Sequence, residues 1–248
     1  METYSRQTER VAYEKPALKE VVVTLFLADE SKSYPSLPGL CESEFIGLFA
    51  ESVAIDAIPQ SDHSSSFALP PRPTVQLRTD DKSFYLQHGP GVLSFHALSP
   101  YCGFEEMEDR VLKVTRFLED RLPDFKVDDV NLLYFNSFDF TGEKIIIANY
   151  FDIGIHIPRV PHLTPTAIRD FQVSTEVEYQ ELNRSVQVTL HSYLNRQVGL
   201  RLECWALERP EWASEKLSQW LLESHDLLGD VFETTITDRT RTLLGRKP

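Results

Sequence analysis

The dipeptide His225-Asp226 is a residue pair that could do metal chemistry, and it lies in a segment whose pattern predicts a helix. Metal-dependent phosphohydrolases combine such a pair with further histidines and acids from neighbouring helices. No such additional ligands are visible in the sequence. We therefore expect His225 to border a buried stripe next to Leu221 and Leu228, with its ring held by a hydrogen bond.

Two other patterns match metal sites only in part. His156 and His162 flank a Pro-Arg-Val-Pro turn, but no carboxylate or cysteine at ligand spacing joins them. Pro123-Asp124 and Glu143-Lys144 suggest a nuclease core, in which two acids and a lysine lie on adjacent strands. The residue that such a core requires between its glutamate and lysine is missing, and Pro123 ends a predicted helix. The sequence therefore predicts no metal ligands, no catalytic residues and no cofactor.

Charged residues on predicted strands offer a different chemistry. Glu176, Glu178, Arg201 and Glu203 fall on the polar faces of segments that we expect to be neighbouring strands. Ion pairs between adjacent strands account for such charges. The alternative is a pair of carboxylates in a cleft.

Signatures of nucleotide and acyl-transfer sites are absent from the sequence. There is no phosphate-binding loop, no glycine-rich dinucleotide motif and no nucleophile elbow of the G-x-S-x-G type. Cys41, Cys102 and Cys204 are odd in number and far apart, which fits neither a disulfide framework nor a zinc site. We expect them to be buried free thiols in a reducing compartment.

The balance of charge limits the partners. The 248 residues carry a formal net charge of −13, which argues against direct binding of nucleic acid by this chain alone, because phosphates require a basic surface. The exception is the C-terminal segment, where four cations fall within nine residues. These are the candidate partner-binding residues: Arg239, Arg241, Arg246 and Lys247.

The N-terminal residues carry no sign of a targeting or membrane segment. Residues 1–15 are charged throughout and lack the apolar core of a signal peptide. The longest apolar stretch, residues 21–28, is interrupted by Thr24 and is too short to span a bilayer. We expect a cytoplasmic protein that does not enter a membrane.

Hydrophobic spacing predicts the elements of the first half. Residues 18–28 are β-branched and apolar and predict a strand buried on both faces, and residues 43–55 predict a short amphipathic helix. Three short strands are expected between residues 74 and 98. Apolar residues at spacings of three and four then predict a helix over 104–122, whose acidic first turn and basic end complement the helix dipole.

The second half shows the same outline. Strands are predicted over residues 130–140, 144–157, 168–179, 185–193 and 199–207. A helix over 214–232 follows. Because both halves run strand, strand, strand, helix, the sequence predicts an α+β fold of antiparallel sheets, each covered by a helix, and suggests duplicated βββα units.

The chain divides into an arm and two halves. Residues 1–16 are polar and end at Pro16, so we expect a flexible arm. A first α+β half over 17–140 and a second over 141–248 should pack as one compact unit. Residues 59–73 hold four prolines and three consecutive serines, which predicts a mobile surface loop.

Four segments carry a family resemblance: KPALKEVVVTLFL (15–27), YLQHGPGVLSFHALSPYCGFEEM (85–107), VNLLYFNSFDF (130–140) and HDLLGDVFETTITDRTRTLLG (225–245). In this order they resemble the Pro-x-x-x-Glu-Val opening strand, the central hairpin, the Arg-Tyr-Ile-Asn strand and the closing His…Phe-Glu…Thr segment of one family. That family is sporadically distributed in bacteria and archaea, is of unknown function and has no established catalytic residues. Leu133 stands where it has the arginine, so any role of that arginine is lost or moved.

These observations favour a non-enzymatic binding subunit of a larger bacterial protein complex. The family's patchy distribution resembles that of genes in mobile or defence islands, which implies a role in antiphage defence. Its partners would be proteins, in a hetero-complex or a homo-oligomer. Two alternatives stay open: a metal-dependent hydrolase or nuclease with dispersed acidic residues, and a sensor that holds a small ligand between sheet and helices.

Overall fold

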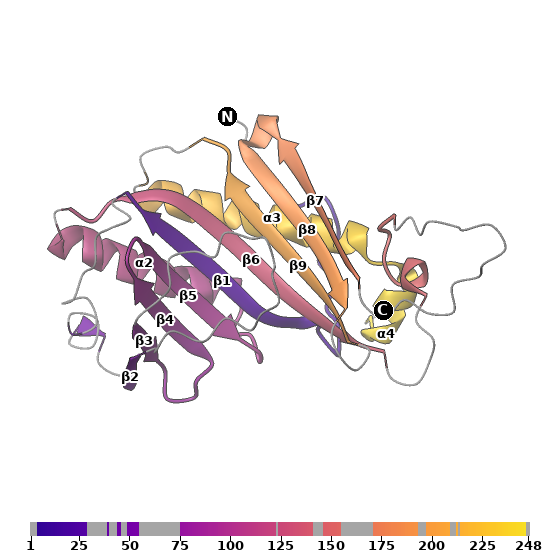
Figure 1. The fold of residues 1–248 in the computed structure, drawn as a ribbon, viewed down its shortest axis with the longest axis horizontal. Coiled ribbons are helices and arrows are strands. Elements are labelled where there is room, and N and C mark those ends of the chain that lie inside the picture. The colour runs from indigo at the N-terminus through magenta and orange to yellow at the C-terminus, as the bar shows by residue number, and fades with distance from the viewer. Residues whose placement is uncertain are drawn as a thin grey trace.

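Nine strands form one antiparallel sheet within the part of the chain that the computed structural model describes (Figure 1). That part comprises residues 4–28, 39, 44–45, 49–54, 75–122, 124–140, 146–154, 171–192, 197–208, 212 and 214–246. The strands are β1 (Leu18–Leu27), β2 (Glu51–Ala54), β3 (Val75–Arg78), β4 (Phe84–Gly89), β5 (Val92–Leu98), β6 (Val127–Asp139), β7 (Gln172–Tyr179), β8 (Arg184–Ser192) and β9 (Gln197–Ala206).

The order of the strands joins the two halves of the chain. It runs β2-β3-β4-β5-β1-β6-β9-β8-β7, so β6 of the first half pairs with β9 of the second, with Leu132 opposite Cys204. The expectation of a separate sheet in each half is therefore wrong. Both β6 and β9 carry apolar side chains, and pairing them removes the edge that each half would otherwise expose.

Alternation along the strands gives the sheet one apolar face. Val21, Val23 and Leu25 of β1 are at most 1% exposed, and Leu132 of β6 and Leu202 of β9 are fully buried on the same face. Residues two apart on a strand point to the same side, so each strand contributes a row of apolar side chains.

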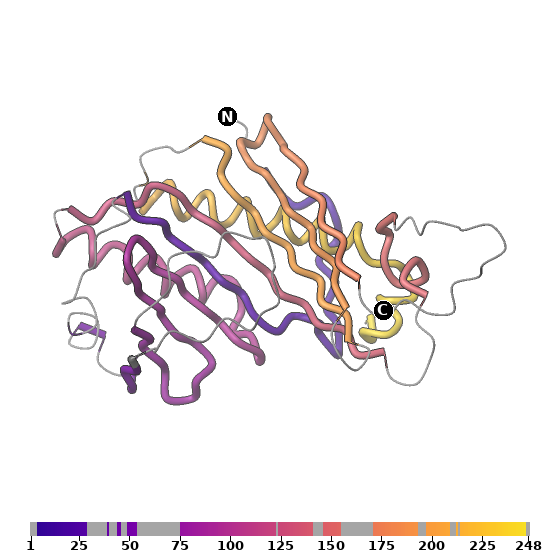
Figure 2. The backbone as a smooth tube through the Cα atoms, in the orientation of Figure 1, coloured from indigo at the N-terminus to yellow at the C-terminus, as the bar shows by residue number. Residues whose placement is uncertain are grey.

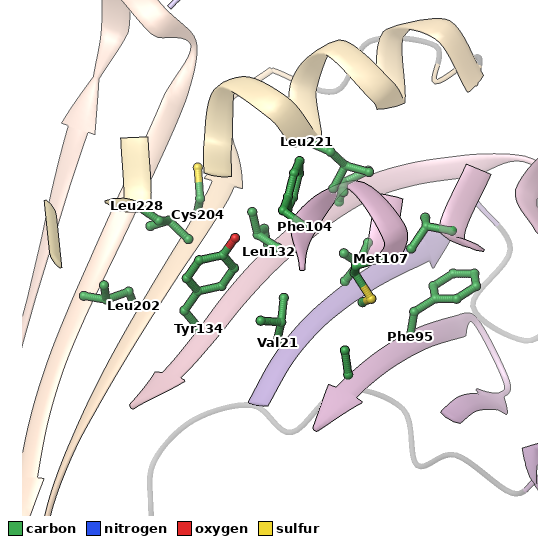
Figure 3. Packing of buried hydrophobic residues seen from close by; sticks show 14 of the residues in the cluster. Val21, Phe95, Phe104, Met107, Leu132, Tyr134, Leu202, Cys204, Leu221 and Leu228 are labelled. Carbon is green, nitrogen blue, oxygen red and sulfur yellow. The ribbon is translucent and has the colours of Figure 1, made fainter. Parts of the chain in front are cut away.

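Two long helices cover this apolar face. They are α2 (Phe104–Arg121) and α3 (Ser214–Thr235), and both lie behind the sheet in Figure 1. Figure 3 shows Phe104 and Met107 of α2 and Leu221 of α3 among the buried side chains of the strands. Burying one such side chain stabilises the fold by ~1.5–3 kcal/mol. A short helix, α4 (Asp238–Leu243), follows α3.

Three smaller expectations have different outcomes. Residues 51–54 of the predicted helix over 43–55 form strand β2 instead, paired with β3. Within the predicted strand over 144–157, residues Ile147–Asn149 form a 3-10 helix. The predicted loop over 59–73 lies outside the described residues.

No helix among the described residues is long and apolar enough to cross a membrane.

Candidate functional site

Helix α3 carries a stripe of acids on the side that faces away from the sheet. Asp226, Asp230 and Glu233 are spaced by four and three residues, which places them on one side of a helix. Leu221 and Leu228 lie on the opposite side and are fully buried. The three acids are only 6–8% exposed. Buried carboxylates require hydrogen-bond donors, and the N-terminal residues supply them.

Residues 4–14, called the arm below, cross α3 (Figure 2). Asp230 accepts hydrogen bonds from the hydroxyl of Tyr4 at 2.5 Å and from the backbone N–H groups of Gln7 at 2.8 Å and Thr8 at 2.7 Å. Asp226 accepts from the guanidinium of Arg10 at 3.1 Å. Over its described residues, the segment that we expected to be a flexible arm is hydrogen-bonded to α3, and its mobility stays a prediction.

These hydrogen bonds keep Asp230 ionised. Burial by itself would raise the pKa of Asp230, but the donors from Gln7, Thr8 and Tyr4 outweigh it and hold the pKa below its ordinary value. Burial and the charge of Asp230 raise the pKa of Tyr4. The tyrosine therefore stays protonated as a donor, and the carboxylate stays charged as an acceptor.

Gly229 lies where the arm crosses α3. A Cβ atom at this position would lie 2.7 Å from a guanidinium nitrogen of Arg6, so the flexible end of that side chain would have to shift. Glycine in a helix interior costs about 1 kcal/mol relative to alanine, so its presence in α3 fits a packing requirement. An isolated glycine beside an acidic stripe is the signal in the sequence from which this contact could have been inferred.

The arm continues to the C-terminal residues. The hydroxyl of Tyr13 donates to Glu233 at 3.0 Å. The backbone N–H groups of Glu14 and Lys15 donate to the carbonyls of Gly245 and Leu244 at 3.2 and 3.0 Å. The first and last described segments of the chain are thus joined by main-chain hydrogen bonds.

A groove of about 660 Å³ lies where these segments meet. It is called the terminal groove below, and it is bounded by Thr8, Glu9 and Val11 of the arm, by Asp152, by the end of α3 and by the C-terminal segment that includes α4. Its charged lining residues are Glu9, Asp152, Glu233, Asp238, Arg241 and Arg246. Four carboxylates against two guanidinium groups leave a surplus of two negative charges.

The structure brings together two of the four candidate partner-binding cations. Arg241 lines the groove and donates to Glu233 at 3.2 Å and to Asp238 at 2.8 Å. Arg246 also lines it, 3.5 Å from Glu9, with about half of its side chain exposed. Arg239 lies 4.9 Å over the ring of Tyr150, and Lys247 is outside the described residues. Arg241 therefore builds the groove, whereas Arg246 can also contact a partner.

His225 has the surroundings that the sequence predicted. Its Nδ1 is hydrogen-bonded to the hydroxyl of Tyr134, and its ring stacks on Phe104 with 4.0 Å between centroids. Burial lowers the pKa of His225 to about 4, so the imidazole is neutral near pH 7. Asp226 bonds the arm, so the two side chains are not directed at a shared ligand.

Among the described residues, we find no ion pair between adjacent strands of the kind predicted for these charges. Arg201 forms an ion pair with Glu203, two residues along the same strand. Glu176 lies opposite Gln187, and Glu178 accepts a hydrogen bond from Gln180 at 2.7 Å. Among the described residues, no group of three or more histidines, cysteines or acids is placed to hold a metal ion.

The cysteines differ from one another. Cys204 is fully buried, as predicted, and burial raises the pKa of its thiol to about 11. Cys102 is exposed, which contradicts the expectation of a buried thiol. Cys41 lies outside the described residues.

Sequence analysis missed a hydrogen-bonded network on the other face of the sheet. His96 contacts Glu20 through Nδ1 at 2.8 Å and Ser94 through Nε2 at 3.0 Å, and Tyr85 donates to Glu20 at 2.9 Å. Ser94 and His96 are two apart on β5, which was the available signal. This resembles a catalytic triad, but the side chain of Glu20 is 28% exposed and Ser94 only 8%. A nucleophilic serine has to be accessible to substrate, and here the serine is the less exposed of the two residues. We therefore assign the network to stabilising this face of the sheet.

No protein-family model matches the chain, and a search of curated proteins finds no relative. The family resemblance in the sequence therefore stays a prediction, and any function must be argued from the geometry.

Proposed function

We propose that this chain is a non-enzymatic binding subunit of a larger protein complex, and that the terminal groove receives its protein partner. The observation that carries the proposal is the groove of about 660 Å³, in which charged side chains are exposed at the junction of the two ends of the described chain.

The walls of the groove are fixed before a partner arrives. Glu233 is held by Tyr13 and Arg241, and the arm is held by Asp230. Binding to such a surface loses little conformational entropy, because few of its side chains have to be ordered. The groove is thus suited to recognition.

The rim of the groove is open to exchange. The ion pair between Arg246 and Glu9 is 3.5 Å long, and the side chain of Glu9 is 83% exposed. Exposed pairs of this kind contribute at most about 1 kcal/mol. A charged group of a partner can therefore replace either member at little cost.

The charge of the groove favours a cationic partner segment. Its surplus of two negative charges agrees in sign with the net charge of −13. An acidic protein attracts a basic partner over long range, mainly through the association rate. Cations by themselves would favour an acidic partner, but Glu233, Asp238 and Glu9 offset the two cations of the C-terminal segment that line the groove.

The test is affinity purification from native cells with a double charge reversal, Glu9→Lys with Asp152→Lys. Glu9 and Asp152 are exposed, and the change turns the groove from a surplus of two negative charges to two positive ones. The matched control is Glu105→Lys with Asp120→Lys on α2, which changes the net charge equally, far from the groove in sequence. We expect the partner of the wild-type protein to remain with the control and to be lost from the groove variant.

Two results would reject the proposal. One is a partner that binds the groove variant as well as the control. The other is loss of cellular function on alanine substitution of Glu203 or His225, with folding and partner binding intact, which would favour an enzyme.

The volume of the groove also favours a second candidate, a small-ligand sensor. Pockets for small molecules measure roughly 300–1,000 Å³. Free arginine is a suitable probe, because its guanidinium matches the acidic lining. Calorimetric binding of arginine that is lost on Val11→Trp, which fills the groove, would support this candidate, and no binding would reject it.

We also propose that β3-β4-β5-α2 and β7-β8-β9-α3 are duplicated units. The supporting observation is the strand order, because β3-β4-β5 and β7-β8-β9 each run inwards to a strand that flanks the β1–β6 pair, and each is followed by a long helix. A superposition of residues 75–121 on 172–235 without a common topology would reject this proposal.

A further inference from the structure

Strand β7 is an edge of the sheet in the part of the chain that the structure describes. Within the described residues it pairs with β8 alone, and Figure 1 shows it as the outermost strand beside β8. Six of its eight residues are exposed, and the side chain of Val177 is 42% exposed. The strand at the other end, β2, has four residues, half the length of β7.

An edge of this length can accept another strand. Edge strands present a row of unpaired N–H and C=O groups, and proteins usually block them with a short strand, a proline, a lysine or a bulge. β7 has eight residues, QVSTEVEY, with no proline and no cation. Its register with β8 runs without a shift from Gln172 to Tyr179. Apart from the charges of Glu176 and Glu178, the usual obstacles to strand addition are thus missing from β7.

The side chains of β7 define the partner. Glu176 and Glu178 lie on one face, and Val173 and Val177 lie on the other. A strand that carries cations on one face and apolar residues on the other complements both, since opposite charges and apolar pairs stabilise neighbouring strands. A second copy would instead bring four carboxylates together on one ribbon, which disfavours self-pairing.

We propose that β7 binds an extended segment of a partner protein as a tenth strand, and that this segment alternates lysine or arginine with apolar residues. The proposal rests on the protein-binding function proposed above, but it uses a surface distinct from the terminal groove. Main-chain hydrogen bonds supply the affinity, and the alternating side chains supply the specificity.

Synthetic peptides test the proposal directly. The probe is a peptide of four Lys-Val repeats, and its two controls are four Glu-Val repeats and the Lys-Val peptide methylated on every backbone nitrogen. Fluorescence anisotropy measures affinity, and hydrogen exchange measures protection of the amides of residues 172–179. We expect the Lys-Val peptide alone to bind, to protect β7 and to bind less tightly at high salt.

Charge reversal on β7 separates this site from the groove. Glu176→Lys with Glu178→Lys should weaken binding of the Lys-Val peptide about tenfold, because two attractive pairs become repulsive. The control Glu105→Lys with Asp120→Lys should leave the affinity unchanged, and so should the groove variant Glu9→Lys with Asp152→Lys.

Each contrary result overturns the proposal. Binding without protection of β7 places the peptide elsewhere, and equal binding of the methylated peptide excludes strand addition. Binding lost in the groove variant but kept in the β7 variant assigns the peptide to the terminal groove, which would leave the proposed function standing without this site. Self-association that needs β7 would make a second copy the occupant.

Discussion

The two buried sides of α3 are stabilised by different interactions, apolar packing on one and charge-assisted hydrogen bonds on the other. Toward the sheet, Leu221 and Leu228 are fully buried among apolar side chains. Toward the arm, Asp230 and Glu233 are almost as deeply buried, but each is held by charge-assisted hydrogen bonds. The leucines of the apolar side carry no titratable group, whereas the acidic side depends on donors in the arm that lie more than 200 residues away in the chain.

The largest effect is expected on the apolar side. Leu221→Ala should lower the free energy of unfolding by about 2–5 kcal/mol, because it leaves a cavity at a fully buried position. Urea denaturation at neutral pH measures the change. A loss below about 1 kcal/mol would mean that the sheet-facing side of α3 is not the main source of its stability.

Titration of His225, which lies beside the apolar side, comes next. Its folded pKa of about 4 lies below the ordinary value of 6.5, so the fold favours the neutral ring. The stabilisation is therefore complete above about pH 6.5 and is lost as the pH falls toward 4, by about 3 kcal/mol in total. His225→Phe keeps the stack on Phe104 and should show a shallower loss of stability over this range. Equal slopes for the two proteins would contradict the buried neutral histidine.

The acidic side should respond locally to a change of one atom. Asp230→Asn removes the charge that accepts from Gln7 and Thr8, at a cost of about 2 kcal/mol. We expect limited proteolysis to cut the arm sooner in this variant, and to leave the arm of Leu221→Ala protected until global unfolding. In the wild type the depressed pKa of Asp230 makes this contribution available above about pH 4 and reduces it below. An arm equally protected in both variants would show that Asp230 does not hold it.

The smallest effect is expected in the network of Glu20, His96 and Tyr85 on the other face of the sheet, because its carboxylate is partly exposed to water. Glu20→Gln should cost about 1 kcal/mol at pH 7, because the side chain of Glu20 is partly exposed. Burial alone would raise the pKa of Glu20, but the hydrogen bond from His96 holds it below the ordinary value. The difference between variant and wild type should therefore shrink below about pH 4, which denaturation at several pH values measures. A cost as large as that of Asp230→Asn would mean that burial does not set the strength of these networks.

Local periodicity predicted most elements of the fold. Apolar spacing placed α2 and α3 within three residues of their observed ends, and alternation placed β8 and β9 within two. The single sheet was not predicted, because the pairing of β6 with β9 joins residues more than 50 apart and produces no periodic pattern in the sequence. Residues 51–54 were assigned to a helix because four residues are too few for an alternating pattern to stand out.

The candidate site was less accessible to sequence reasoning. The cations of the C-terminal segment were recognised by their density, but their counterions come from Glu9 in the arm and from α3. The arm itself is polar and short, and the sequence of such a segment predicts flexibility unless its hydrogen-bond acceptors are known. Asp226, Asp230 and Glu233 are spaced like an ordinary solvated helix face, so only Gly229 distinguished them.

The contact between the arm and α3 also sets an order of events during synthesis. A ribosome releases residues 4–14 long before residues 226–246, which hold them. The arm therefore lacks its hydrogen-bond acceptors while the sheet and α2 are synthesised. It can dock only after α3 has left the exit tunnel of the ribosome. The terminal groove does not exist in any shorter product of translation, so a partner that recognises it selects chains that have been made through residue 246.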